Sequence, residues 1–554
     1  MTRLGVVGGG TMGAGVVQVA AQQGMDVVLL DVRQDLLDAS VDRIRGFIQR
    51  SVERGRMSQI DGDAAMAHIQ TTTDYAALAD ADCVIEAALE DIKVKSDVFH
   101  QLDEHCRPDA ILATNTSSLS VTEIGATTKR PDRVVGLHFF NPVPLMALVE
   151  VVRGQASSQE AVDRAFKIGT ALGKTPVRAE DTPGFIVNRV VRPFYNEALR
   201  ILSDGAASVA DIDRIMKGVG FRMGPFELMD LIGNDINFAA TTGVYRQYFD
   251  EPRFRPSLRQ QRAVQGGLLG QKTGRGWYER GSQASDGVPE SVARREPPKF
   301  DGPIAVLLDS SLGADVAAAL ASAGLDVRSH AVRGDNWDVG QAGHMKDLGD
   351  ALNGATAVVD CTTGGLVERR ALLREVGSSI APGVPIAALA LTVSTTEISS
   401  WCAGPGRVCG FGYLPPLDDA RIIEVAPGLQ TGGAAWTAVE GLAAALDRET
   451  VTVGDNAGLV ATRIVALITN EAAFALSESV ATAGDIDLAV RLGVNYPHGP
   501  LEWADLIGID VIYQVIEGLH REFGEDRYRP APILRKMTLA GWTGRKAGRG
   551  FFTY

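Results

Sequence analysis

The 554-residue chain carries the same series of short motifs twice, and this repetition constrains its fold more than any other feature. Five motifs recur 274 positions later, namely TEI, RVVG (as RVCG), NEA, DID and GRG, which begin at residues 122, 133, 196, 211 and 274. Nearer the N-terminus the spacing becomes 300, which aligns Gly13 with Gly313 and Gly24 with Gly324, so the second copy has lost about 26 residues. Matches at a fixed offset over such a distance indicate a tandem duplication.

Each copy begins with strand-like segments and ends with helical ones. In the first copy, short apolar runs alternate with helix-like segments, and these runs are Leu4–Val7, Val27–Leu30, Cys83–Glu86, Ile111–Thr114 and 134–137. This alternation predicts an α/β Rossmann fold with a doubly wound, mostly parallel sheet. After Pro183 the strand signals end, and residues 187–202 and 212–219 have helical spacing. An all-α C-terminal domain is therefore expected in each copy.

The duplication and the change from strands to helices divide the chain into five predicted regions. We expect two α/β domains at residues 1–182 and 303–454, two helical domains at 183–280 and 455–554, and a linker at 281–302. The linker is rich in Gly, Ser and Pro, which favour irregular structure. Domains of these sizes can bury hydrophobic cores without disulfides or metals.

The composition excludes several classes of protein. A formal net charge of −14 disfavours binding to nucleic acid or to an anionic membrane surface. The five cysteines are widely spaced and form no Cys-x-x-Cys pair, so neither a disulfide framework nor a structural metal site is expected. No apolar run approaches the roughly 18 residues of a membrane span. Because a strand is predicted at the very N-terminus, where a signal peptide would lie, we expect a soluble, cytoplasmic protein.

A glycine-rich loop follows the first predicted strand. Residues 8–13 read GGGTMG, which fits G-x-G-x-x-G, and a predicted helix follows at 14–23. Gly8, Gly10 and Gly13 would allow a tight turn and close approach of a pyrophosphate, and Thr11 and Met12 in the same loop are further candidate cofactor contacts. Asp31 lies 18 residues after the last glycine, at the end of the second strand. A carboxylate there can bind the ribose 2′-hydroxyl, so the sequence predicts NAD rather than NADP as cofactor.

Two further polar motifs follow predicted strands. Residues 115–118 read NTSS and residues 138–142 read HFFNP, so both fall at the carboxyl edge of the sheet, where ligands bind in this fold. Glu150 lies in the apolar run 147–152, where a carboxylate is costly unless it is paired. His138 has the properties of a base that removes an alcohol proton, with Glu150 as its partner. The alternative reading is a buried histidine and glutamate with a structural role.

Together these motifs and DTPGFIVNR at residues 181–189 resemble the L-3-hydroxyacyl-CoA dehydrogenase family, over residues 1–280. The resemblance implies NAD-dependent oxidation of (3S)-3-hydroxyacyl-CoA to 3-oxoacyl-CoA. It implies that His138 is the base and Glu150 its partner. It also implies that Ser117 and Asn188 bind the reacting oxygen and the acyl chain, although Asn188 alone could be a helix cap.

The resemblance implies further contacts to the cofactor and to CoA. The cofactor contacts would be Glu90, Lys95, Asn115, Asn141 and Lys272. Residues 34–73 would form a helical hairpin over the CoA, where Arg54 and Arg56 could meet its phosphates, although surface arginines are often only solvated. Phe47 stands about where the family often has a CoA-contacting serine, which is a departure from its pattern.

The second copy has lost the polar groups of the first. At the positions of His138, Ser117, Asn188, Asn141 and Asp31 it has Gly412, Leu391, Thr462, Pro415 and Ala331. Glu424 remains opposite Glu150, and the missing residues fall in the region of the CoA hairpin. We therefore expect a degenerate second copy without catalytic activity.

The family usually dimerises through its helical domains, so the second helical domain could cover the first in an intramolecular pseudo-dimer, with homodimerisation also open. The tandem form resembles bacterial enzymes acting on 3-hydroxyadipyl-CoA in phenylacetate breakdown, and 3-hydroxybutyryl-CoA is the nearest alternative. Two other hypotheses are a dehydrogenase of free hydroxy acids and a non-catalytic dinucleotide-binding scaffold.

Overall fold

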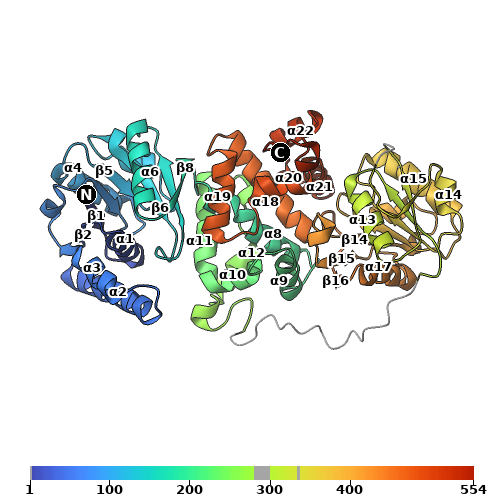
Figure 1. Cartoon of the computed structure of the whole chain (residues 1–554), viewed down its shortest axis with the longest axis horizontal. Coiled ribbons are helices and arrows are strands. Elements are labelled where there is room, and N and C mark those ends of the chain that lie inside the picture. Colours follow the sequence, from blue (N-terminus) through green and yellow to red (C-terminus); the bar gives the residue numbers. More distant parts are fainter. Residues whose placement is uncertain (1–2, 280–299, 334–336) are drawn as a thin grey trace. The chain divides into compact units, whose positions relative to one another are not determined.

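The computed structural model describes residues 3–279, 300–333 and 337–554. Most of the predicted linker 281–302 lies outside these residues. The chain forms two compact units: unit 1 comprises Met1–Val190 with Ala475–Gly499, and unit 2 comprises Val191–Phe474 with Pro500–Tyr554. Each unit therefore contains segments of both copies. Figure 1 labels the helices and strands along the chain. The predicted domain boundaries remain predictions.

Unit 1 is built on an eight-stranded sheet in the order β3-β2-β1-β4-β5-β6-β7-β8. Its strands are β1 Leu4–Val7, β2 Val27–Leu30, β3 Ile69–Thr72, β4 Cys83–Glu86, β5 Ile111–Thr114, β6 Val134–Phe139, β7 Leu148–Arg153 and β8 Thr175–Glu180. β6 and β7 pair antiparallel, and the other neighbours pair parallel. The predicted doubly wound fold is confirmed. Residues 69–72 differ from the prediction, because they form edge strand β3 instead of the end of a helical hairpin.

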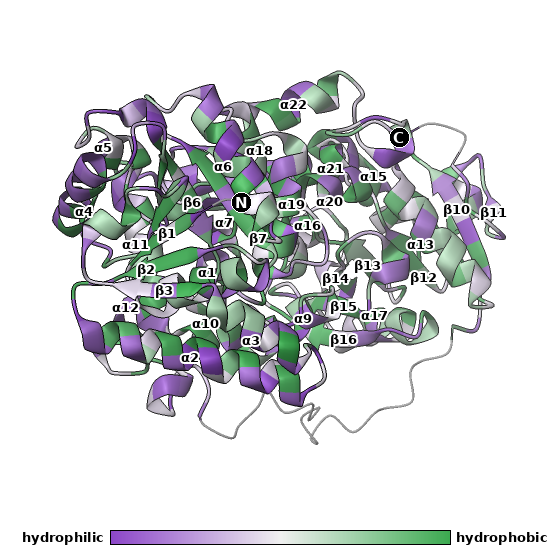
Figure 2. Cartoon of the chain, turned by 60° about the vertical axis from the view of Figure 1, so that its left-hand side comes forward, coloured by the Kyte–Doolittle hydropathy of each residue, from purple (hydrophilic) through white to green (hydrophobic). Residues whose placement is uncertain are grey.

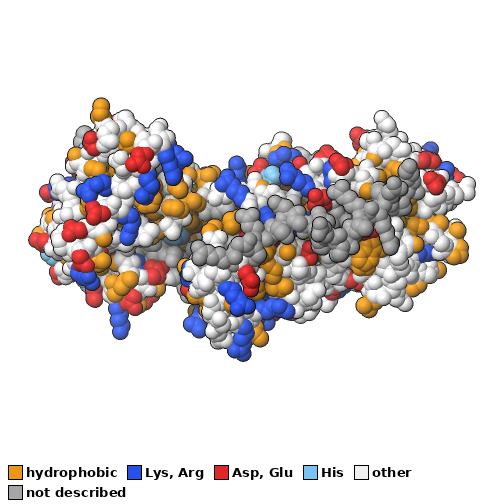
Figure 3. Space-filling model, turned by 90° about the horizontal axis from the view of Figure 1, so that it is seen from below, with side chains coloured by type: hydrophobic (Ala, Val, Ile, Leu, Met, Phe, Trp, Pro, Cys, Tyr) orange, Lys and Arg blue, Asp and Glu red, His pale blue; other side chains and the backbone are white. Residues whose placement is uncertain are grey.

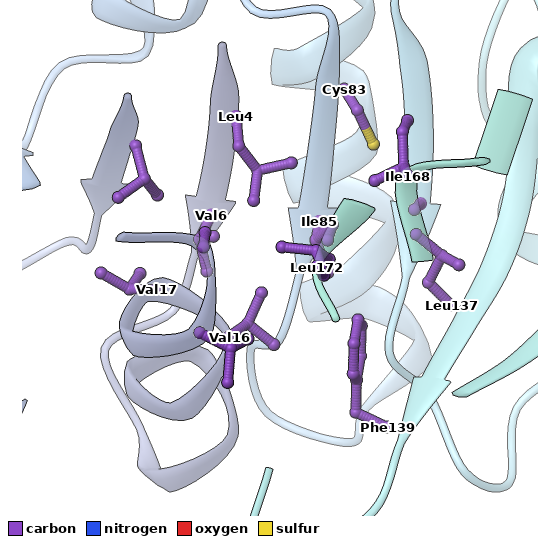
Figure 4. Packing of buried hydrophobic residues seen from close by; sticks show 14 of the residues in the cluster. Leu4, Val6, Val16, Val17, Cys83, Ile85, Leu137, Phe139, Ile168 and Leu172 are labelled. Carbon is purple, nitrogen blue, oxygen red and sulfur yellow. The ribbon is translucent and has the colours of Figure 1, made fainter. Parts of the chain in front are cut away.

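Helices cover this sheet and close its hydrophobic core. They are α1 Thr11–Gln22, α2 Gln34–Glu53, α3 Gln59–Ala67, α4 Ile92–His105, α5 Val121–Gly125, α6 Gln159–Ala171, α7 Val187–Val190 and, from the second copy, α19 Ala483–Val494. Buried side chains of the strands, such as Val6, Ile85 and Phe139, meet Val16 of α1 in one cluster (Figure 4). β1 and β2 are buried throughout and β2 is entirely hydrophobic, whereas α2 is amphipathic (Figure 2).

Unit 2 contains a second eight-stranded sheet, and its strand order β11-β10-β9-β12-β13-β14-β15-β16 repeats that of the first. The strands are β9 Ile304–Leu308, β10 Val327–Ala331, β11 Gly343–His344, β12 Ala357–Asp360, β13 Ile386–Leu389, β14 Val408–Gly412, β15 Ile422–Ala426 and β16 Glu449–Thr452. The described residues between β10 and β11 contain no helix, so the CoA hairpin has no counterpart there. The predicted duplication of the α/β fold is confirmed.

The remaining helices of unit 2 come from both copies. Those of the second α/β region are α13 Ser311–Ser322, α14 Leu348–Leu352, α15 Leu366–Ser379, α16 Thr395–Ser400 and α17 Gly433–Ala445. The first copy contributes α8 Arg192–Ser203, α9 Val209–Gly218, α10 Pro225–Ile232, α11 Asn234–Gln247 and α12 Leu258–Gln265. The second contributes α18 Ala461–Ser477, α20 Pro500–Ile507, α21 Ile509–Phe523 and α22 Pro532–Leu539. The last residues of α18 belong to unit 1. The predicted all-α regions are confirmed.

The surface carries charges of both signs. On the face shown in Figure 3, acidic and basic side chains are interspersed in each unit. Among the described helices, none combines the length and apolarity needed to cross a bilayer.

Candidate active site

The glycine loop and the start of α1 form a cradle that fits a pyrophosphate. Gly8 has a φ of 106°, which favours glycine, and a Cβ there would lie 2.6 Å from the carbonyl oxygen of Ala87. A Cβ on Gly13 would lie 1.9 Å from the carbonyl oxygen of Gly8, so this glycine lets α1 pack closely on β1. Gly10 is the N-cap residue of α1, and no side chain caps the helix there. A Cβ added to Gly10 would meet no described atom within 4 Å. The amide groups of the first turn, at Thr11 and Met12, are therefore accessible to an anion.

Asp31 lies at the end of β2, beside this loop. Its Oδ2 accepts a hydrogen bond of 2.6 Å from the backbone N–H of Gly9. The bond fixes the carboxylate next to the cradle, where it can accept from a ribose hydroxyl and repels a 2′-phosphate. The residues present fit NAD.

His138 and Glu150 face each other across the antiparallel strands β6 and β7. His138 Nδ1 lies 2.6 Å from Glu150 Oε2, and both side chains are buried. Glu150 Oε1 accepts from the backbone N–H groups of Ile186 and Val187, at 3.1 and 2.9 Å. With Nδ1 bonded to a carboxylate, Nε2 of the imidazole can accept a proton from a ligand, and the buried charge of Glu150 stabilises the imidazolium that results.

Two aromatic rings flank the imidazole of His138. The ring centroids of Phe140 and Phe185 lie 4.6 and 5.7 Å from that of His138. Phe185 has a φ of 47°, a strained value for a bulky residue, in the turn that leads into α7. The same turn carries the amides that bind Glu150, and Asn188 follows in α7, half-buried. Glu150 thus ties α7 and Asn188 to the strand pair that holds His138.

Glu90 organises the loop that carries Ser117. Its Oε1 accepts from Thr116 Oγ1 at 2.7 Å, from the N–H groups of Ser117 and Ser118 at 2.9 and 3.0 Å, and from Ser118 Oγ at 2.8 Å. Burial would raise the pKa of Glu90, but the ammonium of Lys95 and these hydrogen bonds hold that pKa below its ordinary value. Ser117 Oγ is 3.3 Å from the same oxygen and its residue is exposed, so its hydroxyl can turn towards a ligand.

Lys95 is buried between two carboxylates. Its Nζ lies 2.7 Å from Glu86 Oε1 and 3.4 Å from Glu90 Oε2. Glu86 also belongs to this site, although its residue motif alone does not predict it. Its position at the end of an apolar strand was a usable signal, because a carboxylate in such a run needs a partner, as Glu150 does.

The other predicted cofactor and substrate contacts lie in different places. Asn115 Oδ1 accepts from the N–H of Phe139 at 2.9 Å, which joins the ends of β5 and β6, and Asn141 is exposed just after β6. Arg54 and Arg56 are exposed after the end of α2. Lys272 belongs to unit 2, where its Nζ pairs with Asp235 at 2.5 Å. The ligand contacts of all these residues remain predictions.

The corresponding positions of the second copy are filled. A Cβ on Gly412, at the position of His138, would lie 2.5 Å from Leu459 Cδ1 and 3.0 Å from Leu391 Cδ2. Asp309, which stands where the first copy has Gly9, accepts from the N–H groups of Thr363 and Gly364 at 3.0 and 2.7 Å. A carboxylate in this loop repels a pyrophosphate. These features favour the prediction that the second copy is inactive.

Comparison with known proteins gives matches along most of the chain. Residues 3–182 match the model of the 3-hydroxyacyl-CoA dehydrogenase NAD-binding domain, and residues 184–280 and 458–554 each match the C-terminal domain of that family. A 3-hydroxyadipyl-CoA dehydrogenase from Escherichia coli is 37% identical over 96% of this chain and 97% of the relative. A 3-hydroxybutyryl-CoA dehydrogenase from Clostridioides difficile is 43% identical over 50% of this chain and 99% of the relative. The crystal structure of a 3-hydroxybutyryl-CoA dehydrogenase from Escherichia coli K12 has a TM-score of 0.76 and 34% identity, and the match covers 97% of this chain and 98% of that one.

Proposed function

The chain belongs to the 3-hydroxyacyl-CoA dehydrogenase family and uses NAD, and we propose that His138 and Glu150 carry its catalytic reaction. The observation that carries the proposal is the buried 2.6 Å contact between these two side chains near the carboxyl end of β6. NAD, when bound, supplies the acceptor for a hydride. His138 Nε2 takes the proton of the 3-hydroxyl group as C3 gives up its hydride, so the alcohol becomes a ketone and the proton stays on the imidazole.

Ser117 and Asn188 position the reacting oxygen in this proposal. The Ser117 hydroxyl is presented by a loop that Glu90 fixes, and Asn188 is held by the turn that Glu150 binds. A hydroxyl and an amide can both donate to the oxygen of the 3-oxo product, which orients C3 for hydride transfer. Asp31 and the amides of the glycine loop would hold the ribose and the pyrophosphate of the cofactor.

We further propose a substrate of the (3S)-3-hydroxyacyl-CoA class whose acyl chain ends in a carboxylate, with 3-hydroxyadipyl-CoA as the best candidate. The supporting observation is the relative of that name, which matches the chain over almost its full length. The second candidate is 3-hydroxybutyryl-CoA, which the half-length relative from Clostridioides difficile favours. A terminal carboxylate would need a basic partner, and Arg192, Arg222 and Arg246 are candidates by position in the sequence. A place in phenylacetate degradation remains a prediction.

An assay across acyl chains tests this function. Wild-type enzyme is given 3-hydroxyadipyl-CoA, 3-hydroxybutyryl-CoA and free 3-hydroxyadipate, each with NAD and with NADP. We expect turnover of the CoA esters with NAD, with the higher kcat/KM for the dicarboxylic ester. A higher kcat/KM for 3-hydroxybutyryl-CoA would replace the acyl chain proposed here. Turnover of the free acid alone would overturn the proposal of a CoA substrate.

For the quaternary arrangement we propose that the two helical domains pair within one chain as a pseudo-dimer. Three contacts between the copies have a counterpart with the roles exchanged, at the spacing of 274. The ion pair Arg253–Glu471, at 2.8 Å, has its counterpart in Arg527–Glu197, at 3.7 Å. The ion pair Arg189–Glu478, at 2.7 Å, has its counterpart in Arg463–Asp204, at 3.4 Å. The backbone hydrogen bond from Glu180 N to Val480 O, at 2.9 Å, has its counterpart in the bond from Gly454 N to Ala206 O, at 2.6 Å. Such reciprocity is the property of an isologous two-fold interface.

Light scattering of the full chain tests this arrangement. A pseudo-dimer whose interface is satisfied internally gives the mass of one chain at micromolar concentration, whereas a further homodimer gives twice that mass.

A cytoplasmic location is also proposed, and the five free, buried thiols are compatible with it.

A further inference from the structure

Lys95 is buried against two protein carboxylates. Its side chain is 1% exposed and that of Glu86 is 0% exposed. Glu86 also accepts from Thr114 Oγ1 at 2.7 Å and from the N–H of Ala88 at 2.6 Å. Burial of an ammonium group is costly unless it is paired and hydrogen-bonded. The folded protein therefore needs these contacts to Lys95 whether or not a ligand is bound.

The second copy retains this buried pair. Asp360 and Arg369 stand 274 residues after Glu86 and Lys95, and Arg369 Nη2 and Nε lie 2.7 and 2.9 Å from Asp360 Oδ2. Both side chains are buried, as in the first copy. The pair persists although the second copy lacks the glycine fingerprint and the histidine. Its shared role is therefore to fasten the helix, α4 or α15, to the end of the preceding strand.

The two pairs differ in what else the cation binds. Arg369 Nη2 also donates to the carbonyl oxygen of Leu389, at 2.8 Å. Lys95 instead faces Glu90, at 3.4 Å, and Gly364 stands at the position of Glu90 in the second copy. The contact to a second carboxylate is thus found in the copy that carries Ser117 and is missing from the copy that has Leu391 there.

We propose that Lys95 is a positioning residue for Ser117. Its ammonium anchors the carboxylate of Glu90, and Glu90 in turn fixes the backbone of the loop through the N–H groups of Ser117 and Ser118. This role differs from the direct contact with the nicotinamide half of NAD that the family resemblance implies. It rests on the dehydrogenase activity proposed above, because Ser117 acts on the substrate of that reaction.

Lys95→Met tests the proposal, with Arg369→Met as the matched control. Each substitution removes the cation of a buried pair and leaves the carboxylate, so both are expected to lower Tm. We expect Lys95→Met to lower kcat at least tenfold at saturating NAD, with less than a threefold change in the Kd of NADH. We expect Arg369→Met to change neither kcat nor that Kd by more than about twofold. Lys95→Arg, which keeps the charge, should recover part of the lost kcat.

Three outcomes would overturn the proposal. One is a tenfold weaker binding of NADH by Lys95→Met with an unchanged kcat, which would make Lys95 a cofactor contact. Another is an equal loss of kcat in Arg369→Met, which would reduce both effects to general destabilisation. The third is an unchanged kcat and Kd in a folded Lys95→Met protein.

A measurement independent of turnover keeps this test separate from that of the proposed function. Hydrogen exchange is followed in the peptide that contains residues 115–120, in the full chain without ligand. Loss of Lys95 should speed exchange of the Ser117 and Ser118 amides, because their acceptor Glu90 is released, whereas Arg369→Met should leave the peptide protected. Equal protection in wild type and Lys95→Met contradicts the positioning role even if the substrate class proves wrong.

Discussion

Glu150 and Glu424 occupy the same position in the two copies but have different partners. Both lie on the strand that pairs antiparallel within its sheet, and both bind two backbone N–H groups at the start of the following helical segment. Glu150 does so with Oε1 alone, which leaves Oε2 for His138. Glu424 uses both oxygens on the backbone, at 2.7 and 3.0 Å.

This difference separates the structural function of the carboxylate from the catalytic function that we propose for Glu150. The second copy keeps the glutamate although Gly412 stands at the position of His138, so the hydrogen bonds from strand to helix are a sufficient reason to retain it. In the first copy the same anchor leaves one oxygen for His138. The electrostatic consequence is visible at Glu424, whose pKa burial raises to about 7, with only the two backbone N–H groups opposing the shift.

The largest effect is expected when the carboxylate of Glu150 is exchanged for an amide, and the same exchange at Glu424 is the control. In Glu150→Gln, the amide oxygen must face the N–H groups of Ile186 and Val187, so the NH₂ group donates to His138 Nδ1. The proton of the imidazole is then forced onto Nε2, which can no longer act as a base, and kcat should fall by about 10²–10⁴-fold. Glu424→Gln should keep kcat within about twofold. Equal losses in the two variants would show that the comparison between copies is wrong.

A smaller effect is expected in the pH dependence of stability. The pKa of Glu424 is about 7 in the folded chain and 4.5 in a model peptide, so the folded state binds its proton more tightly. The stability that this group contributes is present below pH 4.5 and is lost as pH rises through 7, by up to about 3 kcal/mol. Calorimetry at pH 5 and pH 8 should show a smaller drop in Tm for Glu424→Gln than for wild type. An identical drop in both proteins would remove Glu424 as the titrating group.

The stoichiometry of cofactor binding should distinguish the copies without any substitution. The first copy offers an open cradle with Asp31, whereas the second has Asp309 in the loop and Ala331 in place of the ribose ligand. Calorimetric titration of the full chain with NADH should therefore give one site per chain. Even Asp309→Gly should add no second site, since the ribose carboxylate is still missing. Two equivalent sites would contradict the assignment of the second copy as degenerate.

The sequence predicted the parts of the fold in which burial leaves a continuous apolar signal. β1, β2, β4 and β5 are central strands, and their apolar runs give their bounds directly. β3 is half exposed at the sheet edge and contains Gln and Thr, so its sequence resembles the end of the preceding helical segment.

The site was predictable to a similar degree. His138 and Glu150 are recognisable because a buried carboxylate needs a partner, and the family motifs supply one. The link from Glu86 through Lys95 to Glu90 could not be inferred from spacing, because it depends on how the start of α4 packs against the ends of β4 and β5. The partition into two units is likewise absent from the local sequence, since α19 of the second copy packs on the first sheet.

We propose that His138 is the base of the one active copy, and the variant His138→Gln tests this role most directly. The glutamine cannot take a proton from the 3-hydroxyl group, while the glycine loop and Asp31 remain intact. Steady-state kcat at saturating NAD and acyl-CoA should fall by about 10²–10⁴-fold, with the Kd of NADH changed less than about threefold. A variant that retains wild-type kcat would place the proton acceptor elsewhere and contradict the account.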